Sequence, residues 1–297
     1  MKTVPGVTCL VVLLAAAHLP AQDMPLAQLL IADEGWELVG ERYTFTEAPA
    51  VDGQGTVYFA DVPDSKIYKI DATGKPVVWI ENSERTSGLM FGPNELLYGC
   101  QSGARRIVAY DTAGHAQVIA DDVDCNDLVV NRVGGIYFTD PKNHQVWHID
   151  PRGQTRLVDT GIERPNGIIL WADQQTLVVA DTAGPHLWAF RVEPDGSLAY
   201  KQPFYTCRLV RGETASGADG LAADTQGRIY AATSAGLSVF DTQGRLSGVI
   251  AKPQDRTLSN VVLGGPKFDT LYVTSTDKVF RRKTTASGLR YFEPAAR

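Results

Sequence analysis

The feature that most constrains the fold is a turn-and-strand pattern that recurs six times along the chain. Each copy begins at a turn rich in Gly, Pro, Asp or Asn and continues into two short apolar strands. The turns begin at Asp52, Phe91, Asn131, Trp171, Asp224 and Gly264, at intervals of 39, 40, 40, 53 and 40 residues. A repeat near 40 residues with several strands per unit is typical of a β-propeller blade. The sequence therefore predicts an all-β, six-bladed propeller with a central channel, because a β-sandwich or a β-helix does not explain repeated hairpins at this interval.

The first repeat shows the pattern inside one unit. An apolar strand over residues 57–60 is followed by a turn and by a second strand over residues 66–70. The fourth unit is longer, with an insertion at residues 193–196 whose Glu-Pro-Asp-Gly sequence is typical of a hairpin turn. Before the first repeat, residues 36–39 alternate as a short strand. We expect this strand to pair with the last blade and so close the ring, which hides the sheet edges.

The N-terminus resembles a secretory signal. Lys2 is the only charged residue before Asp23, and an apolar run over residues 7–17 precedes small residues suited to cleavage near Ala21. That run is too short to span a bilayer comfortably, although a retained anchor is the alternative. The sequence thus predicts a signal peptide over 1–21, a single propeller domain over 22–297, and a periplasmic or extracellular protein without further membrane association.

Composition and cysteine content restrict the partners. An apolar fraction of 44%, a charged fraction of 21% and a net charge of −6 are typical of a soluble globular protein and argue against a nucleic-acid partner. Cys100, Cys125 and Cys207 follow the signal segment, and the absence of a C-x-x-C motif disfavours a zinc ribbon. A Cys100–Cys125 bridge is conceivable because the two lie in adjacent repeats, but buried free thiols are the expected state.

One residue in each repeat lies 11 or 12 positions before the middle of the next apolar strand. These six residues are Glu47, Ser87, Asn126, Asn166, Asp219 and Asn260. In a closed ring they would face one centre. Each could separately be a turn or cap residue, but the matched spacing favours a shared role. Two carboxylates that converge in a channel repel each other unless a cation lies between them, and calcium prefers carboxylate and amide oxygens.

A second matched set, Asp61, Asp140 and Asp181, is better explained by turn capping.

The chain resembles the gluconolactonase/regucalcin-like (senescence marker protein) family from about Thr46 to Arg282. The resemblance rests on Thr46-Glu47-Ala48-Pro49, Cys125-Asn126-Asp127-Leu128, Arg164-Pro165-Asn166-Gly167, Gly217-Ala218-Asp219-Gly220-Leu221, and Asn260 with Gly264-Gly265-Pro266. It implies a six-bladed propeller that binds calcium or another divalent cation. It also implies that Glu47, Asn166 and Asp219 are metal ligands, and that Asn126 joins the metal shell or contacts the substrate.

Three positions depart from the family pattern. Ala48 stands where Gly is usual, Asp124 stands where sugar-lactone enzymes often carry Arg, and Ser102 stands where many bacterial relatives carry His. The last two concern substrate recognition rather than metal binding. They leave the identity of the lactone open.

The leading hypothesis is a calcium-dependent hydrolase that acts on a small-molecule lactone, with the metal polarising the carbonyl and Asp219 positioning or deprotonating water. No G-x-S-x-G motif is present, which argues against a serine acyl-enzyme. Two alternatives stay open. One is a non-catalytic secreted propeller whose metal is structural and whose channel binds a ligand or partner. The other is a phosphotriesterase-like hydrolase that uses the same cation and water.

Overall fold

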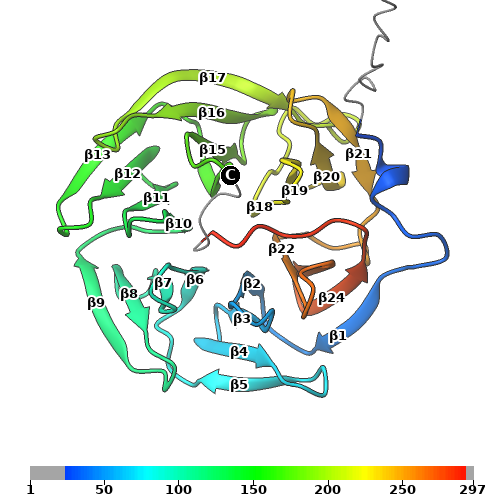
Figure 1. Ribbon diagram of the computed structural model, residues 1–297, viewed down its shortest axis with the longest axis horizontal. Coiled ribbons are helices and arrows are strands. Elements are labelled where there is room, and N and C mark those ends of the chain that lie inside the picture. Colours follow the sequence, from blue (N-terminus) through cyan, green and yellow to red (C-terminus); the bar gives the residue numbers. More distant parts are fainter. Residues whose placement is uncertain (1–23, 292–297) are drawn as a thin grey trace, which may run out of the picture.

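The computed structural model describes residues 24–291, so the predicted signal peptide over residues 1–21 lies outside the described residues. The described chain forms six four-stranded antiparallel sheets arranged as a ring (Figure 1). The prediction of an all-β, six-bladed propeller is confirmed. Within residues 24–291 the only helix is the 3-10 turn η1 (Leu26–Gln28). No helix in this part of the chain is long and apolar enough to cross a membrane.

Each blade takes its four strands from consecutive chain segments, except the last. The first three blades are β2 (Thr46–Val51), β3 (Val57–Asp61), β4 (Lys66–Ile70), β5 (Pro76–Ile80); β6 (Thr86–Phe91), β7 (Leu97–Gln101), β8 (Arg106–Tyr110), β9 (Ala116–Asp121); and β10 (Leu128–Val130), β11 (Ile136–Asp140), β12 (Gln145–Ile149), β13 (Thr155–Thr160). The others are β14 (Pro165–Leu170), β15 (Thr176–Asp181), β16 (His186–Val192), β17 (Leu198–Thr206); β18 (Leu221–Ala223), β19 (Ile229–Thr233), β20 (Gly236–Phe240), β21 (Leu246–Ile250); and β22 (Asn260–Gly264), β23 (Thr270–Ser275), β24 (Lys278–Lys283) with β1 (Glu37–Glu41).

The ring closes where the two ends of the chain share a sheet. β1 is the outermost strand of the sixth blade and pairs antiparallel with β24, with Glu37 opposite Arg281. An ion pair of 2.9 Å joins the carboxylate of Glu37 to Arg281 Nε. At the inner edge, the Ser259 hydroxyl donates to the Thr46 carbonyl at 2.8 Å and links the last blade to the first. The predicted closure by the lead-in strand is confirmed.

The core lies between neighbouring blades. The second strand of a blade is covered on both faces, so β7, β11 and β19 are buried at every position. This explains why these strands have nearly continuous apolar sequences, whereas the outermost strand β9 is mostly exposed. Tyr137 and Tyr230 are among the largest fully buried side chains and fill the space between blades. The fourth blade carries the predicted insertion as a turn between its long outer strands β16 and β17.

The carboxylates at the ends of the second strands cap turns, as their position predicts. Asp61 accepts hydrogen bonds from the backbone amides of Thr44 and Phe45 at 2.8 and 3.0 Å. Asp181 likewise accepts from the amide of Arg164 at 3.0 Å, across to the first strand of its own blade. These side chains serve the turns of the blades.

The C-terminal segment closes one end of the channel. After β24 the chain runs from the rim across the ring toward its centre (Figure 1). The Tyr291 hydroxyl donates to the carbonyl of Leu170, the last residue of β14, at 3.0 Å. The Leu289 amide donates to the carbonyl of Ala223, the last residue of β18, at 3.3 Å. The segment therefore covers the face of the ring where the innermost strands end. The opposite face, where these strands begin, is not covered by this segment.

Candidate functional site

The six predicted oxygen donors lie at the start of the innermost strands, at the channel mouth opposite the C-terminal segment. Glu47, Asn166 and Asn260 belong to β2, β14 and β22 and are buried. Asn126 and Asp219 lie two residues before β10 and β18 and are half-buried. Their common register follows from the blade repeat.

Contacts between successive blades connect these positions. The Ser87 hydroxyl donates to the carbonyl of Asn126 at 2.8 Å. The Asn260 amide donates to the carboxylate of Glu47 at 3.3 Å. The Thr139 hydroxyl donates to the carbonyl of Asn166 at 2.7 Å, which joins the third blade to the fourth.

Glycines permit the close approach between the remaining blades. A Cβ atom on Gly167 would lie 2.1 Å from the carbonyl oxygen of Asp219, and one on Gly220 would lie 1.9 Å from the side chain of Asn260. The glycine that follows the donor is therefore required by packing at these two positions. It brings the fourth, fifth and sixth donors side by side.

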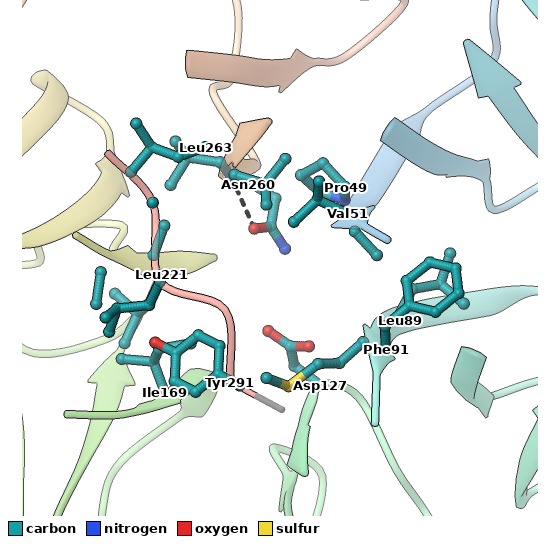
Figure 2. A pocket seen from close by; sticks show the side chains of 18 of the residues that line it. Pro49, Val51, Leu89, Phe91, Asp127, Ile169, Leu221, Asn260, Leu263 and Tyr291 are labelled. Carbon is teal, nitrogen blue, oxygen red and sulfur yellow. Dashed lines mark hydrogen bonds between the residues drawn. The ribbon is translucent and has the colours of Figure 1, made fainter. Parts of the chain in front are cut away.

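Asp127 is a further carboxylate at this site that the sequence reasoning did not assign. It directly follows Asn126, and its carboxyl points into the channel (Figure 2). Its Oδ1 accepts from the amide of Leu128 at 2.8 Å, and the amide of Ile168 in the neighbouring blade also lowers its pKa by hydrogen bonding. The sequence does contain a signal for Asp127. In four other blades the residue after the donor is Gly or Ala, so a carboxylate at this position needs an explanation.

The three carboxyls at the mouth share a poorly solvated environment. Burial, together with the nearby charge of Asp127, raises the pKa of Asp219 to about 8, although Arg164 acts in the opposite direction. Burial raises the pKa of Asp127 to about 7. Burial and the charge of Asp219 raise the pKa of Glu47 well above its usual range. Within residues 24–291 no Lys or Arg forms an ion pair with any of the three. Such a cluster is suited to a bound cation.

The donor chemistry fits a hard cation held by mixed ligands. Among residues 24–291 there is no group of three or more His, Cys, Asp or Glu side chains placed to hold a metal ion. A cation at the mouth would therefore need the amide oxygens of Asn126 and Asn166 as well as the carboxylates of Glu47 and Asp219. Calcium accepts such a mixture, whereas zinc and copper prefer nitrogen and sulfur.

A pocket of about 630 Å³ opens at the same face and includes two of the predicted donors, Ser87 and Asn126. Ser102 and Asp124, the two positions that depart from the family pattern, also line it. Asp124 forms ion pairs with Lys142 at 3.2 Å and with Arg105 at 3.4 Å. The two departures therefore lie where a substrate would contact the protein.

Two further polar side chains of this pocket were missed by the sequence reasoning. His144, an exposed residue, lines the pocket and contacts the carbonyl of Glu163 through Nδ1. Arg164 lines it from the loop before β14, two residues ahead of Asn166. Neither residue falls at the spacing of the donors, so the repeat pattern gives no indication that His144 lies in the pocket.

Behind the donors lies a smaller cavity of about 80 Å³, enclosed by the innermost strands (Figure 2). Asp127 and Asn260 are its polar side chains, and apolar residues such as Leu89 and Leu221 form most of its wall. Leu289 and Tyr291 of the C-terminal segment complete the lining. A substrate would therefore reach the carboxylates from the mouth pocket.

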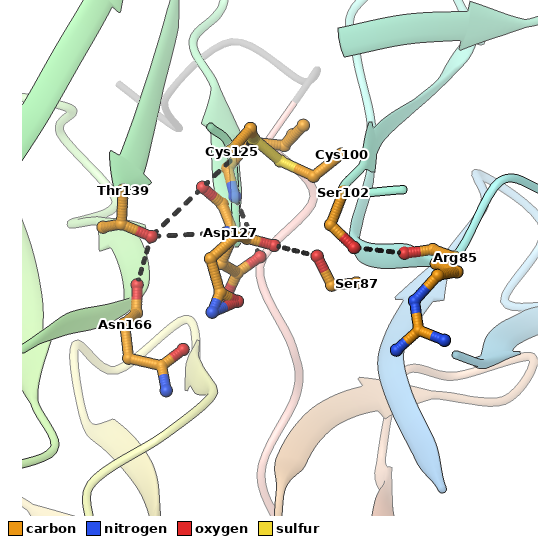
Figure 3. The surroundings of a disulfide bond; sticks show 10 residues. Arg85, Ser87, Cys100, Ser102, Cys125, Asp127, Thr139 and Asn166 are labelled. Atoms are coloured by element: carbon orange, nitrogen blue, oxygen red, sulfur yellow. Dashed lines mark hydrogen bonds between the residues drawn. A yellow bond between two sulfur atoms is a disulfide. The ribbon is translucent and has the colours of Figure 1, made fainter. Parts of the chain in front are cut away.

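The cysteines correct one expectation. Cys100 and Cys125 form a disulfide, with their Cα atoms 5.4 Å apart (Figure 3). Buried free thiols were expected for both, and that expectation is wrong, because the loop before β10 folds back against the end of β7. Cys207 is a buried free cysteine, and burial raises the pKa of its thiol to about 11.

Curated relatives of the chain are lactonases. It is 27% identical over 230 residues to a gluconolactonase of Zymomonas mobilis, covering 68% of this chain and 64% of that protein. It thus spans slightly less than two thirds of this relative's length. It is 24% identical over 228 residues to the pentonolactonase XacC of Haloferax volcanii, covering 74% and 77% of the two chains.

Solved structures share the propeller. A gluconolactonase from Xanthomonas campestris superposes with a TM-score of 0.76 at 25% identity, covering 87% of this chain and 92% of that one. A calcium-binding regucalcin from Agrobacterium tumefaciens superposes with a TM-score of 0.73 at 19% identity, covering 89% and 98%. The sequence model of one family matches residues 45–277, which confirms the resemblance. The chain belongs to the SMP-30/gluconolactonase/LRE-like family.

Proposed function

We propose that this protein is a calcium-dependent hydrolase of a small-molecule lactone. The observation that carries the proposal is the group of three carboxyls at the channel mouth, buried Glu47 and half-buried Asp127 and Asp219. None of the three forms an ion pair with a Lys or Arg of residues 24–291. The relatives named as gluconolactonase and pentonolactonase supply the reaction class.

Glu47, Asn126, Asn166 and Asp219 would hold the cation. A divalent cation bound there supplies electrophilic catalysis, because its charge withdraws electrons from the lactone carbonyl and stabilises the oxyanion. The two neutral amides complete the oxygen ligands without adding negative charge beside the carboxylates. Asp127 adds charge close to Asp219 and strengthens the attraction for a cation.

Residues of the chain then orient the reactants. The substrate approaches from the mouth pocket, where Asn126 contacts it, because the C-terminal segment covers the other end. Asp219 accepts a hydrogen bond from the attacking water and aims it at the carbonyl carbon. Water adds to that carbon, the ring C–O bond breaks, and the ring oxygen takes up a proton. The product is the open hydroxy acid.

A panel of lactones assayed with and without a chelator tests the proposal. We expect hydrolysis by the metal-loaded protein, loss of activity in chelator, and recovery when calcium is returned. Asp219→Asn should lower kcat/KM by at least about a hundredfold. The matched control is Asp64→Asn, which removes an exposed carboxylate whose partner is Lys66. Activity that ignores the chelator, or that survives Asp219→Asn, would refute the proposal.

The same panel separates the alternatives. A phosphotriester substrate such as paraoxon is included, and turnover of it in preference to every lactone would favour phosphotriesterase action. Tight calcium binding without turnover of any substrate would favour a non-catalytic, ligand-binding propeller.

We also propose export directed by residues 1–21. Fractionation of expressing cells should recover the shortened chain outside the cytoplasm, and recovery of the full chain within it would contradict export.

A further inference from the structure

Asn126 and Asp127, like Asp219, lie outside the strands that hold the other channel-mouth residues. Glu47 and Asn260 are paired in the ladders of their blades, and Asn166 lies in β14 at a bulge between the paired residues Pro165 and Ile168. Asn126 and Asp127 instead end the loop over residues 122–127, and the strand after it, β10, has only three residues. The position of these two side chains therefore depends on contacts outside a sheet ladder.

Hydrogen bonds from the third and the second blade hold the end of this loop. The Asn126 amide donates to the carbonyl of Thr139 at 2.9 Å. The Asp127 amide donates to the Thr139 hydroxyl at 3.3 Å. The Ser87 hydroxyl, from the second blade, donates to the Asn126 carbonyl at 2.8 Å.

The disulfide supplies a covalent link at the adjacent residue. Cys125 immediately precedes Asn126, and its partner Cys100 belongs to β7 of the neighbouring blade (Figure 3). Cys100 is fully buried in that strand, which is buried at all five positions, so it is a rigid anchor. Cys125 is itself buried, yet it lines the mouth pocket. The disulfide thus ties the loop before β10 to the second blade at the edge of the proposed site.

The disulfide acts on a loop whose last side chain faces the channel. The loop over residues 122–127 leads into β10, and the carboxyl of Asp127 at its end points into the channel (Figure 2). A covalent anchor one residue from Asn126 limits movement of this loop and so reduces the ordering cost of cation binding.

We propose that the Cys100–Cys125 disulfide is a positioning element that preorganises Asn126 and Asp127 for the cation and the substrate. This inference rests on the proposed function. Loss of the disulfide should weaken calcium binding by about tenfold, as is typical when groups that orient a metal ligand are removed. KM should rise, while kcat at saturating calcium and substrate should change little, because Glu47, Asn166 and Asp219 keep their strand and loop contacts.

The test compares Cys100→Ser/Cys125→Ser with wild type, with Cys207→Ser as the matched control, since Cys207 is a buried free cysteine in another blade. Calcium affinity is measured by calorimetry, and kcat and KM are measured on the best lactone. Hydrogen exchange of the Asn126 and Asp127 amides is measured in chelator. We expect weaker calcium binding, higher KM and faster exchange in the double variant alone. Equal calcium affinity and equal exchange in wild type and double variant would overturn the inference.

Two further results keep the inference separate from the proposed function and from folding. If wild type neither binds calcium nor hydrolyses lactones, the proposed function fails, and the exchange rates in chelator still decide whether the disulfide positions the loop. If the double variant does not fold, dithiothreitol applied to folded wild type gives the same comparison. The dithiol transfers two electrons and two protons to the disulfide, leaving two cysteine thiols and its own cyclic disulfide. Unchanged exchange in the reduced protein would overturn the inference.

Discussion

At the scale of single residues, the channel mouth places acidic groups where water and counter-charges are scarce. Burial is the first cause of the raised pKa of Glu47, Asp127 and Asp219. Each group therefore costs folding free energy when it ionises without a partner. Two consequences can be measured in the metal-free protein, because a cation would remove both.

The first consequence is a stability that falls as the pH rises. Asp219 has a pKa of about 8 in the folded protein, against an ordinary value near 3.8. Between these values the folded state binds more protons than the unfolded state, so the free energy of unfolding decreases with increasing pH. In chelator, the Tm should be lower at pH 8.5 than at pH 5.5, and the difference should be smaller in Asp219→Asn. A Tm that rises over this range, or an equal difference in both proteins, would contradict the account.

The second consequence concerns Asp127, and it has opposite signs for folding and for binding. Asp127→Asn removes the charge that raises the pKa of Asp219. The metal-free variant should be more stable than wild type at pH 8.5, by about 1 kcal/mol. Its calcium affinity should nevertheless fall by about tenfold, because the site loses negative charge. Thermal melts in chelator and calorimetry give the two values. Asp64→Asn should change neither, and a variant that binds calcium as tightly as wild type would exclude a role for Asp127.

At the scale of elements, the start of each innermost strand is set by how closely its neighbour can approach. β14 reaches the backbone of Asp219 because Gly167 has no side chain. The spacing of the repeat places the six residues near the start of the innermost strands, and the structure has them there. The spacing could not predict the Cys100–Cys125 disulfide, which depends on how the loop before β10 folds, nor the inward direction of Asp127.

Gly167→Ala tests this packing. The added methyl group would lie 2.1 Å from the carbonyl oxygen of Asp219, so β14 or the loop before β18 must shift. We expect a loss of about 1–3 kcal/mol in the free energy of unfolding, together with weaker calcium binding. Gly35→Ala is the matched control, because nothing lies within 4 Å of a Cβ atom there. Wild-type stability and calcium affinity in Gly167→Ala would show that the approach of these strands is not required.

At the scale of the whole molecule, the ring depends on both ends of the described chain. β1 completes the sixth blade, and the C-terminal segment closes one end of the channel. The six blades and the closing strand were predictable because a short repeat and a strand pattern encode them. The position of the C-terminal segment was not predictable, because residues 284–291 follow the last repeat and carry no periodic pattern that indicates where they pack.

Tyr291→Phe tests how firmly the C-terminal segment closes its end of the channel. The change removes the hydroxyl that donates to the Leu170 carbonyl at 3.0 Å and leaves that buried carbonyl with one partner fewer. We expect a loss of about 1–3 kcal/mol in the free energy of unfolding. Tyr200→Phe is the matched control, because Tyr200 is 69% exposed. Equal denaturation midpoints for wild type and Tyr291→Phe would show that this contact does not contribute to closure.

The central claim is that the carboxylates and amides of the channel mouth hold a catalytic calcium ion. A crystal structure of the purified protein grown with calcium tests it most directly, through the anomalous signal of the ion. The predicted result is one ion at the mouth, within coordination distance of oxygens from Glu47, Asn126, Asn166 and Asp219. An ion bound only elsewhere, or no ion at the channel mouth in crystals grown at a saturating calcium concentration, would contradict the account.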